Sequence, residues 1–344
     1  LRESIAPVRS GQEKKTKIIY NSLIFSVDPN KSAILMKQKG LVMKRIILFA
    51  LLISLYATNL VASEHRTLVL VASTTQIADF ARQVVGDRCK VHSILAPGAD
   101  PHTYQPTPED VRLVMSADLC LQNGMHLEGK NWMYTLAKDA QKRIVTCTEG
   151  IVALSLDEGG HKVQDPHAWF SPKNAAIYVK NILTAVSAVD EKAADEHRWR
   201  AELYLAQLRA LDGWIRRRFV SIPRQKRILV TSHDAFNYFA QEYGFKNEAP
   251  VGWSTGRDIG GGMTPARRKK VVSSISGFGV PAIFVETSVN PRLMREIAKE
   301  SGVFIGGELY SDSMGEVGSS GETYIGMMRE NVVTIVSALT RSKK

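Results

Sequence analysis

The sequence predicts an α/β fold in which two parallel-sheet lobes are joined by one long helix. Short apolar runs alternate with helical segments up to about residue 189, and the alternation restarts after Pro223. Between these parts lies an uninterrupted helical pattern from about Glu191 to Phe219. Strand–helix alternation is typical of parallel sheets with helices on both faces. A chain of 344 residues is also too long for a typical single core, so we expect two domains.

Residues 43–63 have the pattern of an export leader. Met43-Lys44-Arg45 is followed by the apolar run Ile46–Tyr56 and then by Val61-Ala62-Ser63. A basic start, a short apolar middle and small residues at the end are typical of a secretory signal peptide, here 43–63. About 11 apolar residues are too few to span a bilayer, so an uncleaved anchor is the weaker alternative. We interpret residues 1–42 as an upstream extension or the product of a mis-set start.

The formal net charge of +11 comes mostly from residues 1–63. Residues 1–63 hold 10 Lys and Arg and 3 Asp and Glu, which leaves 35 basic and 31 acidic groups downstream, a net charge of +4. A nucleic-acid-binding surface requires a basic stripe with interleaved aromatic residues. The two basic clusters, Arg216–Arg218 and Arg267–Lys270, fall in expected helices, where we interpret them as solvated faces. We therefore expect no nucleic-acid partner.

The three cysteines are Cys89, Cys120 and Cys147. None directly follows the apolar run, as a lipid-anchored surface protein would require, so we expect a soluble protein of the periplasm. The three residues form no Cys-x-x-Cys pair and are poor candidates for zinc ligands. We expect buried thiols; one disulfide with one thiol left over is the alternative in an oxidising compartment.

Residues 64–190 are expected to form the N-terminal lobe. Leu68–Ala72 is a continuous apolar strand of the kind buried in a parallel sheet. Thr107 and Pro108 predict a helix start, because threonine caps helix N-termini and proline fits the first turn. The other expected elements are a helix over Gln76–Val85, strands over Val91–Leu95, Leu119–Gln122 and Ile144–Cys147, a helix over Trp132–Asp139, a polar loop over Leu154–Gln164, and a helix that Ser171 caps and that runs to about Val189.

Residues 191–220 are expected to form the linking helix. At 1.5 Å per residue, the 29 residues from Glu191 to Phe219 reach about 43 Å, more than one small lobe needs. We interpret this helix as a strut between the lobes; an ordinary helix packed on one lobe is the alternative. An apolar stripe at helical spacing is formed by Tyr204, Leu208, Leu211, Ile215 and Phe219.

Residues 221–344 are expected to form the C-terminal lobe, because strands and helices alternate again. The expected strands are Arg227–Thr231, Ala282–Val285 and Val303–Ile305, with a further one near Ala249–Val251. The expected helices are Phe236–Glu242, Pro265–Ile275, Arg292–Lys299 and Tyr324–Leu339.

Three histidines and one aspartate stand where a ligand site is expected. His102 and His167 each end an Asp-Pro-His tripeptide, and His233 and Asp312 follow at similar intervals. Ligands of open α/β sheets bind outside the carboxyl ends of strands, and His102, His233 and Asp312 each follow an expected strand. Three imidazoles and a carboxylate can complete the shell of a divalent metal. We therefore predict that these four residues hold one metal ion between the lobes, with His126 and His161 as the rival ligands.

At these residues the chain resembles the metal-binding receptors of bacterial ABC importers for zinc and manganese, the cluster A-I or TroA-like solute-binding proteins. The resemblance covers residues 66–340. It implies two α/β lobes joined by a long rigid helix, with the metal held by the same four residues. It also implies a monomer that does not itself span the membrane and whose partners are an ABC permease and its ATPase. The matching stretches are Asp100–Pro108, Asp165–Pro172, Thr231–Phe236, Gly252–Asp258 and Tyr310–Ser313.

The resemblance leaves the metal open. Receptors that favour manganese often carry Glu at the position of His233, and dedicated zinc receptors often have a long His-rich loop near residues 154–164, where this chain has only His161. Three imidazoles and a carboxylate suit zinc, and a second bond from Asp312 would make room for manganese or ferrous iron. We expect Zn²⁺ or Mn²⁺ equally, ahead of Fe²⁺.

Two other functions stay as alternatives to a receptor. A zinc metallohydrolase keeps an open coordination position and a nearby base, for which Glu286 is the one candidate. Four protein ligands and the lack of a His-Glu-x-x-His motif argue against an enzyme. A surface adhesin, a label that some of these receptors carry, needs surface display, and the missing lipid-anchor cysteine argues against that.

Overall fold

The computed structural model describes residues 42–45, 48–49, 66–158, 161–249 and 265–341. The chain divides into two compact units, Leu1–Arg66 and Thr67–Lys344, and every strand found among the described residues lies in the second. In the first unit, residues 42–45 and 48–49 are helical and Arg66 is not, and the expected extension 1–42 and signal peptide 43–63 lie mostly outside the described residues. Among the described residues, no helix combines the length and the apolar character that crossing a membrane requires.

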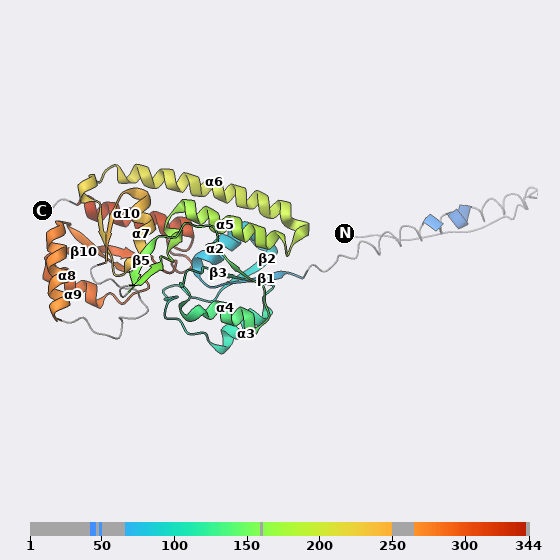
Figure 1. The fold of residues 1–344 in the computed structure, drawn as a ribbon. Helices are drawn as coiled ribbons and strands as arrows, with labels where there is room; N and C mark the ends of the chain where they lie inside the picture. The colour runs from blue at the N-terminus through green and yellow to red at the C-terminus, as the bar shows by residue number, and fades with distance from the viewer. Residues whose placement is uncertain (1–41, 46–47, 50–65, 159–160, 250–264, 342–344) are drawn as a thin grey trace, which may run out of the picture. The chain divides into compact units, whose positions relative to one another are not determined.

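A four-stranded parallel sheet organises the first half of the larger unit (Figure 1). Its order is β2-β1-β3-β4, and the strands are β1 (Leu68–Ala72), β2 (Cys89–Ser93), β3 (Leu119–Gln122) and β4 (Ile144–Thr146). Leu70 of β1 pairs with Val91 on one side and with Leu119 on the other. Because β1 has a neighbouring strand on each side and helices over both faces, its residues are apolar without alternation.

Helices cover both faces of this sheet, as the sequence predicts. Successive side chains of a strand point to opposite faces. Leu70 shares a core with Phe80 and Val179, whereas Val71 shares a separate core with Val114. The helices on the first face are α2 (Thr75–Val85) and α5 (Pro172–Ser187), and those on the second are α3 (Pro108–Ser116) and α4 (Trp132–Asp139).

Of the two expected helix caps, the one at Thr107 forms and the one at Ser171 does not. Thr107 caps α3 with a full capping box, because its hydroxyl accepts from the amide of Asp110 while the Asp110 carboxylate accepts from the Thr107 amide at 2.6 Å. Ser171 does precede α5, but its side chain makes no capping hydrogen bond. Its hydroxyl instead donates to Glu242 Oε2 at 3.5 Å, so a contact with a distant helix replaces the local cap.

The second half contains two pairs of parallel strands. They are β7 (Ile228–Val230) with β8 (Lys246–Glu248), and β9 (Ala282–Glu286) with β10 (Phe304–Leu309). The helices are α7 (Asn237–Tyr243), α8 (Pro265–Phe278), α9 (Arg292–Ser301) and α10 (Tyr324–Thr340). The strand expected near Ala249–Val251 lies mostly outside the described residues, and the described strand β8 directly before it ends at Glu248.

The long helix α6 (Ala194–Phe219) has 26 residues, and a 3₁₀ turn over Glu191–Ala193 replaces its expected beginning. At 1.5 Å per residue it extends over about 39 Å. It packs on α2 and α5 of the first half and on α10 of the second (Figure 1). The stripe residues Tyr204, Leu208, Leu211, Ile215 and Phe219 are all buried. The helix therefore joins the two halves, and the fold class predicted from the sequence is confirmed.

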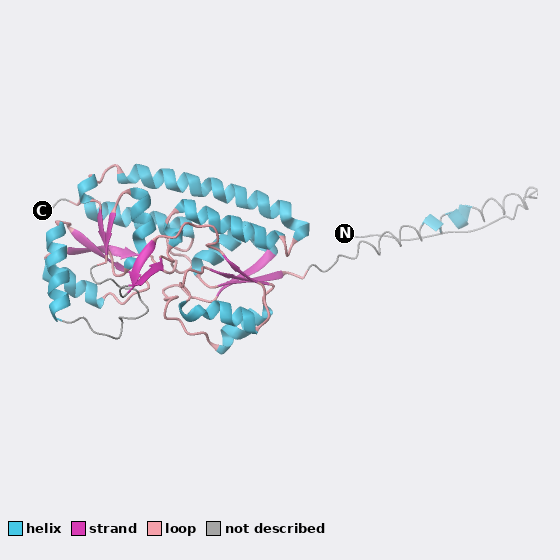
Figure 2. Ribbon diagram, viewed as in Figure 1, coloured by secondary structure: helices cyan, strands magenta, loops and turns pink. Residues whose placement is uncertain are grey.

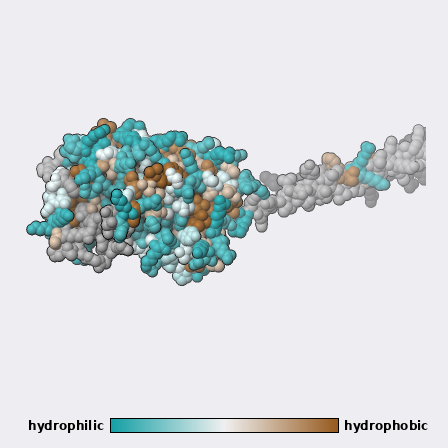
Figure 3. All heavy atoms as spheres, in the orientation of Figure 1, coloured by the Kyte–Doolittle hydropathy of each residue, from teal (hydrophilic) through white to brown (hydrophobic). Residues whose placement is uncertain are grey.

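One hydrophobic core, larger than the separate one around Val71, extends through both halves of this unit. It includes Leu70 of β1, Leu208 of α6 and Leu309 of β10. Helices surround the strands of both halves (Figure 2), and hydrophilic residues predominate on the face drawn in Figure 3. The loops at the strand ends are therefore held in place by one continuous packing unit.

The structure corrects one expectation about the first half and decides between two alternatives for another. The segment Leu154–Gln164 is not only a loop, because it contains the antiparallel strands β5 (Ser155–Glu158) and β6 (His161–Gln164) with Leu156 opposite Val163. A cross-strand apolar pair of this kind stabilises two paired strands. The surrounding polar residues make the segment look like a loop in the sequence. The three cysteines are free and buried, so the disulfide alternative is not realised.

Candidate metal centre

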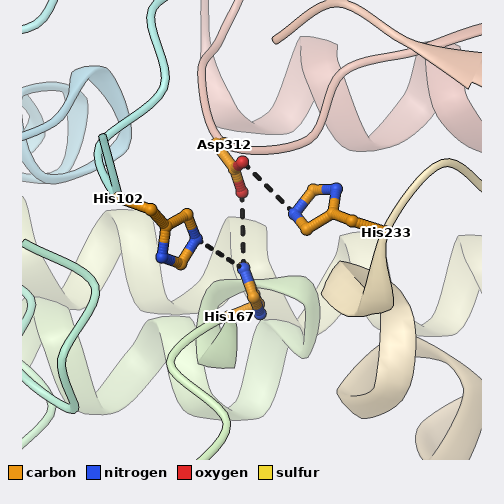
Figure 4. A group of neighbouring side chains, drawn as sticks. All are labelled: His102, His167, His233 and Asp312. Carbon is orange, nitrogen blue, oxygen red and sulfur yellow. Dashed lines mark hydrogen bonds and ion pairs between the residues drawn. The ribbon is translucent and has the colours of Figure 1, made fainter. Parts of the chain in front are cut away.

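The four side chains singled out in the sequence converge on one point (Figure 4). His102 lies in the loop after β2, His167 just before α5, His233 after β7 and Asp312 after β10. One ligand atom from each side chain lies within 4.8 Å of the others. His167, His233 and Asp312 are buried, and His102 is partly exposed. The structure thus brings together all four residues, and metal binding by them stays a prediction.

The distances between these side chains suit a small divalent ion. The Nε2 atoms of His102 and His167 lie 3.2 Å apart, and Nε2 of His167 lies 3.5 Å from Asp312 Oδ1. Nε2 of His233 lies 3.2 Å from Asp312 Oδ2. Four tetrahedral ligands at about 2.0–2.1 Å from an ion are separated by roughly 3.3 Å. Both oxygens of Asp312 face the centre, so the carboxylate can offer one bond or two.

Asp165 orients the ring of His167. Its Oδ1 accepts from the backbone amide of His167 at 3.0 Å and lies 2.8 Å from Nδ1 of the same residue. A proton on Nδ1 leaves the lone pair of Nε2 directed at the centre. Asp165 is itself fixed by Asn237, whose side-chain amide donates to Oδ2 at 3.1 Å. The ring therefore has its tautomer and its direction set before any ion arrives.

Glu286 plays the corresponding part for His233. Its Oε2 forms an ion pair with Nδ1 of His233 at 2.6 Å. Its Oε1 accepts from the backbone amides of Ser232 at 2.7 Å and His233 at 3.0 Å. Among the described residues, Nε2 of His233 and Oδ1 of Asp312 make ion-pair contacts but no hydrogen bond of good geometry: Nε2 lies 3.2 Å from Asp312 Oδ2, and Oδ1 lies 3.5 Å from Nε2 of His167. Buried polar atoms without a good hydrogen bond are rare, and a cation between them would satisfy both.

The first Asp-Pro-His tripeptide works differently from the second. Asp100 Oδ1 accepts from the backbone amide of His102 at 2.8 Å, and its Oδ2 accepts from the Thr103 hydroxyl at 2.9 Å. Both carboxylate oxygens thus fix the backbone rather than the ring. The carbonyl of Pro101 accepts from the indole of Trp132 at 3.0 Å, which holds the same loop from the other side.

The pKa values follow from burial and from the two carboxylates. Burial lowers the pKa of His102 to about 3, so its ring is neutral at neutral pH. Burial also lowers the pKa of His233, but Glu286 and Asp312 outweigh it and raise this pKa well above its usual value. Burial raises the pKa of Asp312, whereas His233 and the other two imidazoles lower it below its usual range. The carboxylate at the centre is therefore ionised and able to bind a cation.

The rival ligands lie away from the centre. His126 is in the loop between β3 and α4, and His161 is exposed on β6. Within the part of the chain that the structure describes, no second group of His, Cys, Asp or Glu has the spacing of a metal site. The matching stretch Gly252–Asp258 lies outside the described residues.

The sequence identified the central residues but not those that support them. Asp165 was visible only as part of a repeated tripeptide, and Glu286 only as a candidate base. The signal was an aspartate two positions before each of two histidines. At this spacing the carboxylate reaches the backbone amide of the histidine. Asn237 gave no signal, because its contact with Asp165 joins segments 72 residues apart.

Comparison with known proteins finds a family whose model matches this chain. The profile of the family described as zinc-uptake complex component A, periplasmic, matches residues 70–338. The manganese-binding lipoprotein MntA of Bacillus subtilis is 40% identical over 283 residues, which are 80% of this chain and 91% of that protein. The iron ABC transporter substrate-binding lipoprotein MtsA of Streptococcus pyogenes is 32% identical over 312 residues, 89% of this chain and 99% of that protein.

A solved structure is also similar to this chain. The periplasmic zinc-binding protein TroA of Treponema pallidum superimposes with a TM-score of 0.74 at 32% identity, over 80% of this chain and all of that one.

Proposed function

Because the chain belongs to the family of periplasmic zinc-uptake components, we propose that it is an extracytoplasmic solute-binding protein that captures one divalent transition-metal ion and delivers it to an ABC importer. The ligands are His102, His167, His233 and Asp312. The observation that carries the proposal is their convergence in a buried centre, where carboxylates behind two of the imidazoles direct the Nε2 atoms inwards. The partners are a membrane permease and its ATPase, to which the monomeric, metal-loaded protein docks.

The ion is Zn²⁺ or Mn²⁺, with Fe²⁺ behind them. Three imidazoles and a carboxylate favour zinc, which also binds more tightly than manganese or ferrous iron at almost any site of this type. The two oxygens of Asp312 lie near different imidazoles, so bidentate binding would give the higher coordination number that manganese and iron accept. Relatives of this chain carry manganese, iron or zinc in their names, which supports this group of metals without selecting one.

A metallohydrolase fits the centre less well than a receptor. Hydrolysis requires a coordination position for water and a base beside it. Four side chains surround the centre, and Glu286, the one candidate base, binds Nδ1 of His233 and two backbone amides. Its oxygens are thus engaged on the far side of the imidazole, and we propose that the protein has no enzyme activity.

We place the protein in the periplasm, exported by the signal peptide 43–63. The bacillar and streptococcal relatives are named lipoproteins. In this chain the first cysteine after the apolar run is Cys89, which is buried in β2 and cannot carry a lipid. Export without a lipid anchor also leaves the adhesin alternative without a means of surface display.

The test of the receptor is the metal content of residues 64–344. The protein is stripped with a chelator and equilibrated with buffered zinc, manganese and ferrous iron together. One metal per chain, lost in Asp312→Ala, is the expected result, and it also identifies the preferred ion. If no metal binds stoichiometrically to the parent protein, the receptor function is wrong.

A matched histidine pair tests the ligand assignment. His167→Ala removes a buried imidazole of the centre and is expected to lower the metal affinity by orders of magnitude. His161→Ala removes an exposed imidazole on β6 and is expected to leave the affinity unchanged. Chelator competition measures both. Equal losses from the two variants would refute the assignment.

A further inference from the structure

The first turn of helix α2 holds both ends of the turn that carries Asp312. The side-chain amide of Gln76 donates to the carbonyl of Ser311 at 3.2 Å, and the hydroxyl of Thr75 accepts from the amide of Met314 at 2.8 Å. The Thr75 hydroxyl in turn donates to Gln76 Oε1 at 3.2 Å. Two adjacent side chains thus form one connected set of hydrogen bonds around Asp312, which we name the α2 grip.

The α2 grip connects distant parts of the chain. Gln76 and Ser311 are 235 residues apart, and Thr75 and Met314 are 239 apart. Helix α2 belongs to the half that supplies His102 and His167, whereas Asp312 follows β10 of the other half. The aspartate is therefore positioned by the half of the protein that does not carry it.

A third contact joins the two ligand-bearing loops directly. The backbone amide of Gly98, in the loop that carries His102, donates to the hydroxyl of Ser313 at 2.7 Å. Gly98 has a φ of 82°, a conformation that residues with a side chain rarely adopt. This backbone shape directs its amide at Ser313, so the loop of His102 and the turn of Asp312 keep a fixed separation.

Contacts within its own half also reach Asp312 and its neighbours. The hydroxyl of Ser288 lies 2.8 Å from that of Ser311 and donates to Asp312 Oδ2 at 3.4 Å. That second contact is long, near the limit for a hydrogen bond. The side chains of the grip are buried, with Thr75 exposed by 7% and Gln76 by 1%. Hydrogen bonds removed from water cost more to leave unmade, so the grip defines the position of the turn.

We propose that Thr75 and Gln76 are positioning residues for metal capture, and that the α2 grip slows metal release by holding Asp312 against the three imidazoles. This inference rests on the proposed function as a metal receptor. A ligand that is already in place loses less conformational entropy on binding. Residues that support ligands from behind contribute about 10–100-fold to metal affinity. The same contacts tie the two halves together, so metal release requires this junction to loosen.

The test compares variants that keep or remove the hydrogen-bonding atoms of the grip. Thr75→Val has the same shape without the hydroxyl, Thr75→Ser keeps the hydroxyl, and Gln76→Met removes the amide. Thr323→Val is the control, because the Thr323 hydroxyl caps α10 by accepting from Gly326 and makes no bond of the grip. The full chain is loaded with Zn²⁺, and its release into excess chelator is followed, together with the unfolding temperature of the metal-free protein and the absorption spectrum of the Co²⁺ form.

The expected result is a release rate about 10–100-fold faster in Thr75→Val and Gln76→Met. Thr75→Ser and Thr323→Val are expected to release metal at the rate of the parent chain. The Co²⁺ spectrum should change in Thr75→Val, because Asp312 moves relative to the ion, and be restored in Thr75→Ser. Lower unfolding temperatures with unchanged release rates and spectra would reduce the grip to ordinary packing and refute the inference. A parent chain that takes up no metal would refute the receptor function, and the inference with it.

Discussion

Glu286 and His233 form a buried ion pair in which Oε2 lies 2.6 Å from Nδ1, on the side of the imidazole that faces away from Asp312. Because the backbone amides of residues 232 and 233 fix the other carboxylate oxygen, the pair has little freedom to rotate. The imidazole can thus present only Nε2 to the centre. A carboxylate in this place fits the proposed role of supporting a metal ligand better than that of a base for hydrolysis.

Glu286→Gln should weaken metal binding about 10–100-fold. The amide has the same size but no charge, and it lowers the pKa of His233 because a carboxylate that raises it is gone. It also offers an N–H where His233 needs an acceptor. Chelator competition of the purified variant measures the loss.

Glu308→Gln provides the comparison, since Glu308 is an exposed glutamate of β10. It should bind metal as the parent chain does. Wild-type affinity in Glu286→Gln would mean that the ion pair does not hold the ligand.

Gly129→Ala should disturb the loop of His102. A Cβ atom at residue 129 would collide with the backbone carbonyl oxygen of His102, and a backbone atom cannot turn aside as a flexible side chain does. The expected loss of metal affinity is at least tenfold. A displacement of about 1 Å is enough to reduce the effect of a positioned group by about a hundredfold.

Gly277→Ala is the matched control for this change. Nothing lies within 4 Å of the Cβ it would add, and Gly277 is in the last turn of α8. Alanine there should leave metal binding unchanged and slightly stabilise the helix. Equal affinities in the two variants would show that the loop of His102 accommodates the side chain at residue 129.

The three cysteines should be inert in the folded protein. Burial raises the pKa of Cys89 and of Cys120 to about 11, and that of Cys147 further. The thiolate is the reactive form, so a thiol reagent at neutral pH should label none of them before denaturation and all three afterwards. Fewer than three labelled thiols after non-reducing denaturation would indicate a disulfide.

The stability of the metal-free protein should depend on pH through Asp79. This carboxylate is 4% exposed and accepts from the amide of Tyr324 at 3.0 Å, and burial raises its pKa above the usual value. A carboxyl whose pKa is raised by folding contributes stability below its unfolded-state pKa, and this contribution is lost as the pH rises through the folded-state value.

Asp79→Asn removes the ionisation and keeps an oxygen that can accept from Tyr324. The free energy of unfolding of the parent chain, relative to that of the variant, should therefore fall from acid to neutral pH. Denaturant unfolding at several pH values measures both. A difference that does not change with pH would show that Asp79 does not titrate in the folded protein.

The sequence alone determined the features that depend on local pattern. The apolar run Leu68–Ala72, the capping signature at Thr107 and the stripe from Tyr204 to Phe219 each lie within one segment, so neighbouring residues are enough to specify them. The four central residues were also predictable, because their chemical types and their positions after strands need no knowledge of contacts.

The tertiary structure decided what depends on segments that meet only in the folded chain. The strand pair around Leu156 and Val163, the ion pair of Glu286 with His233, and the α2 grip on Asp312 have no periodic signature. The strand pair joins residues only seven positions apart, whereas the ion pair and the grip join residues that become neighbours only once the two halves have folded together. A hydrogen bond across more than two hundred residues depends on distance and direction in space, and no stretch of sequence contains these by itself.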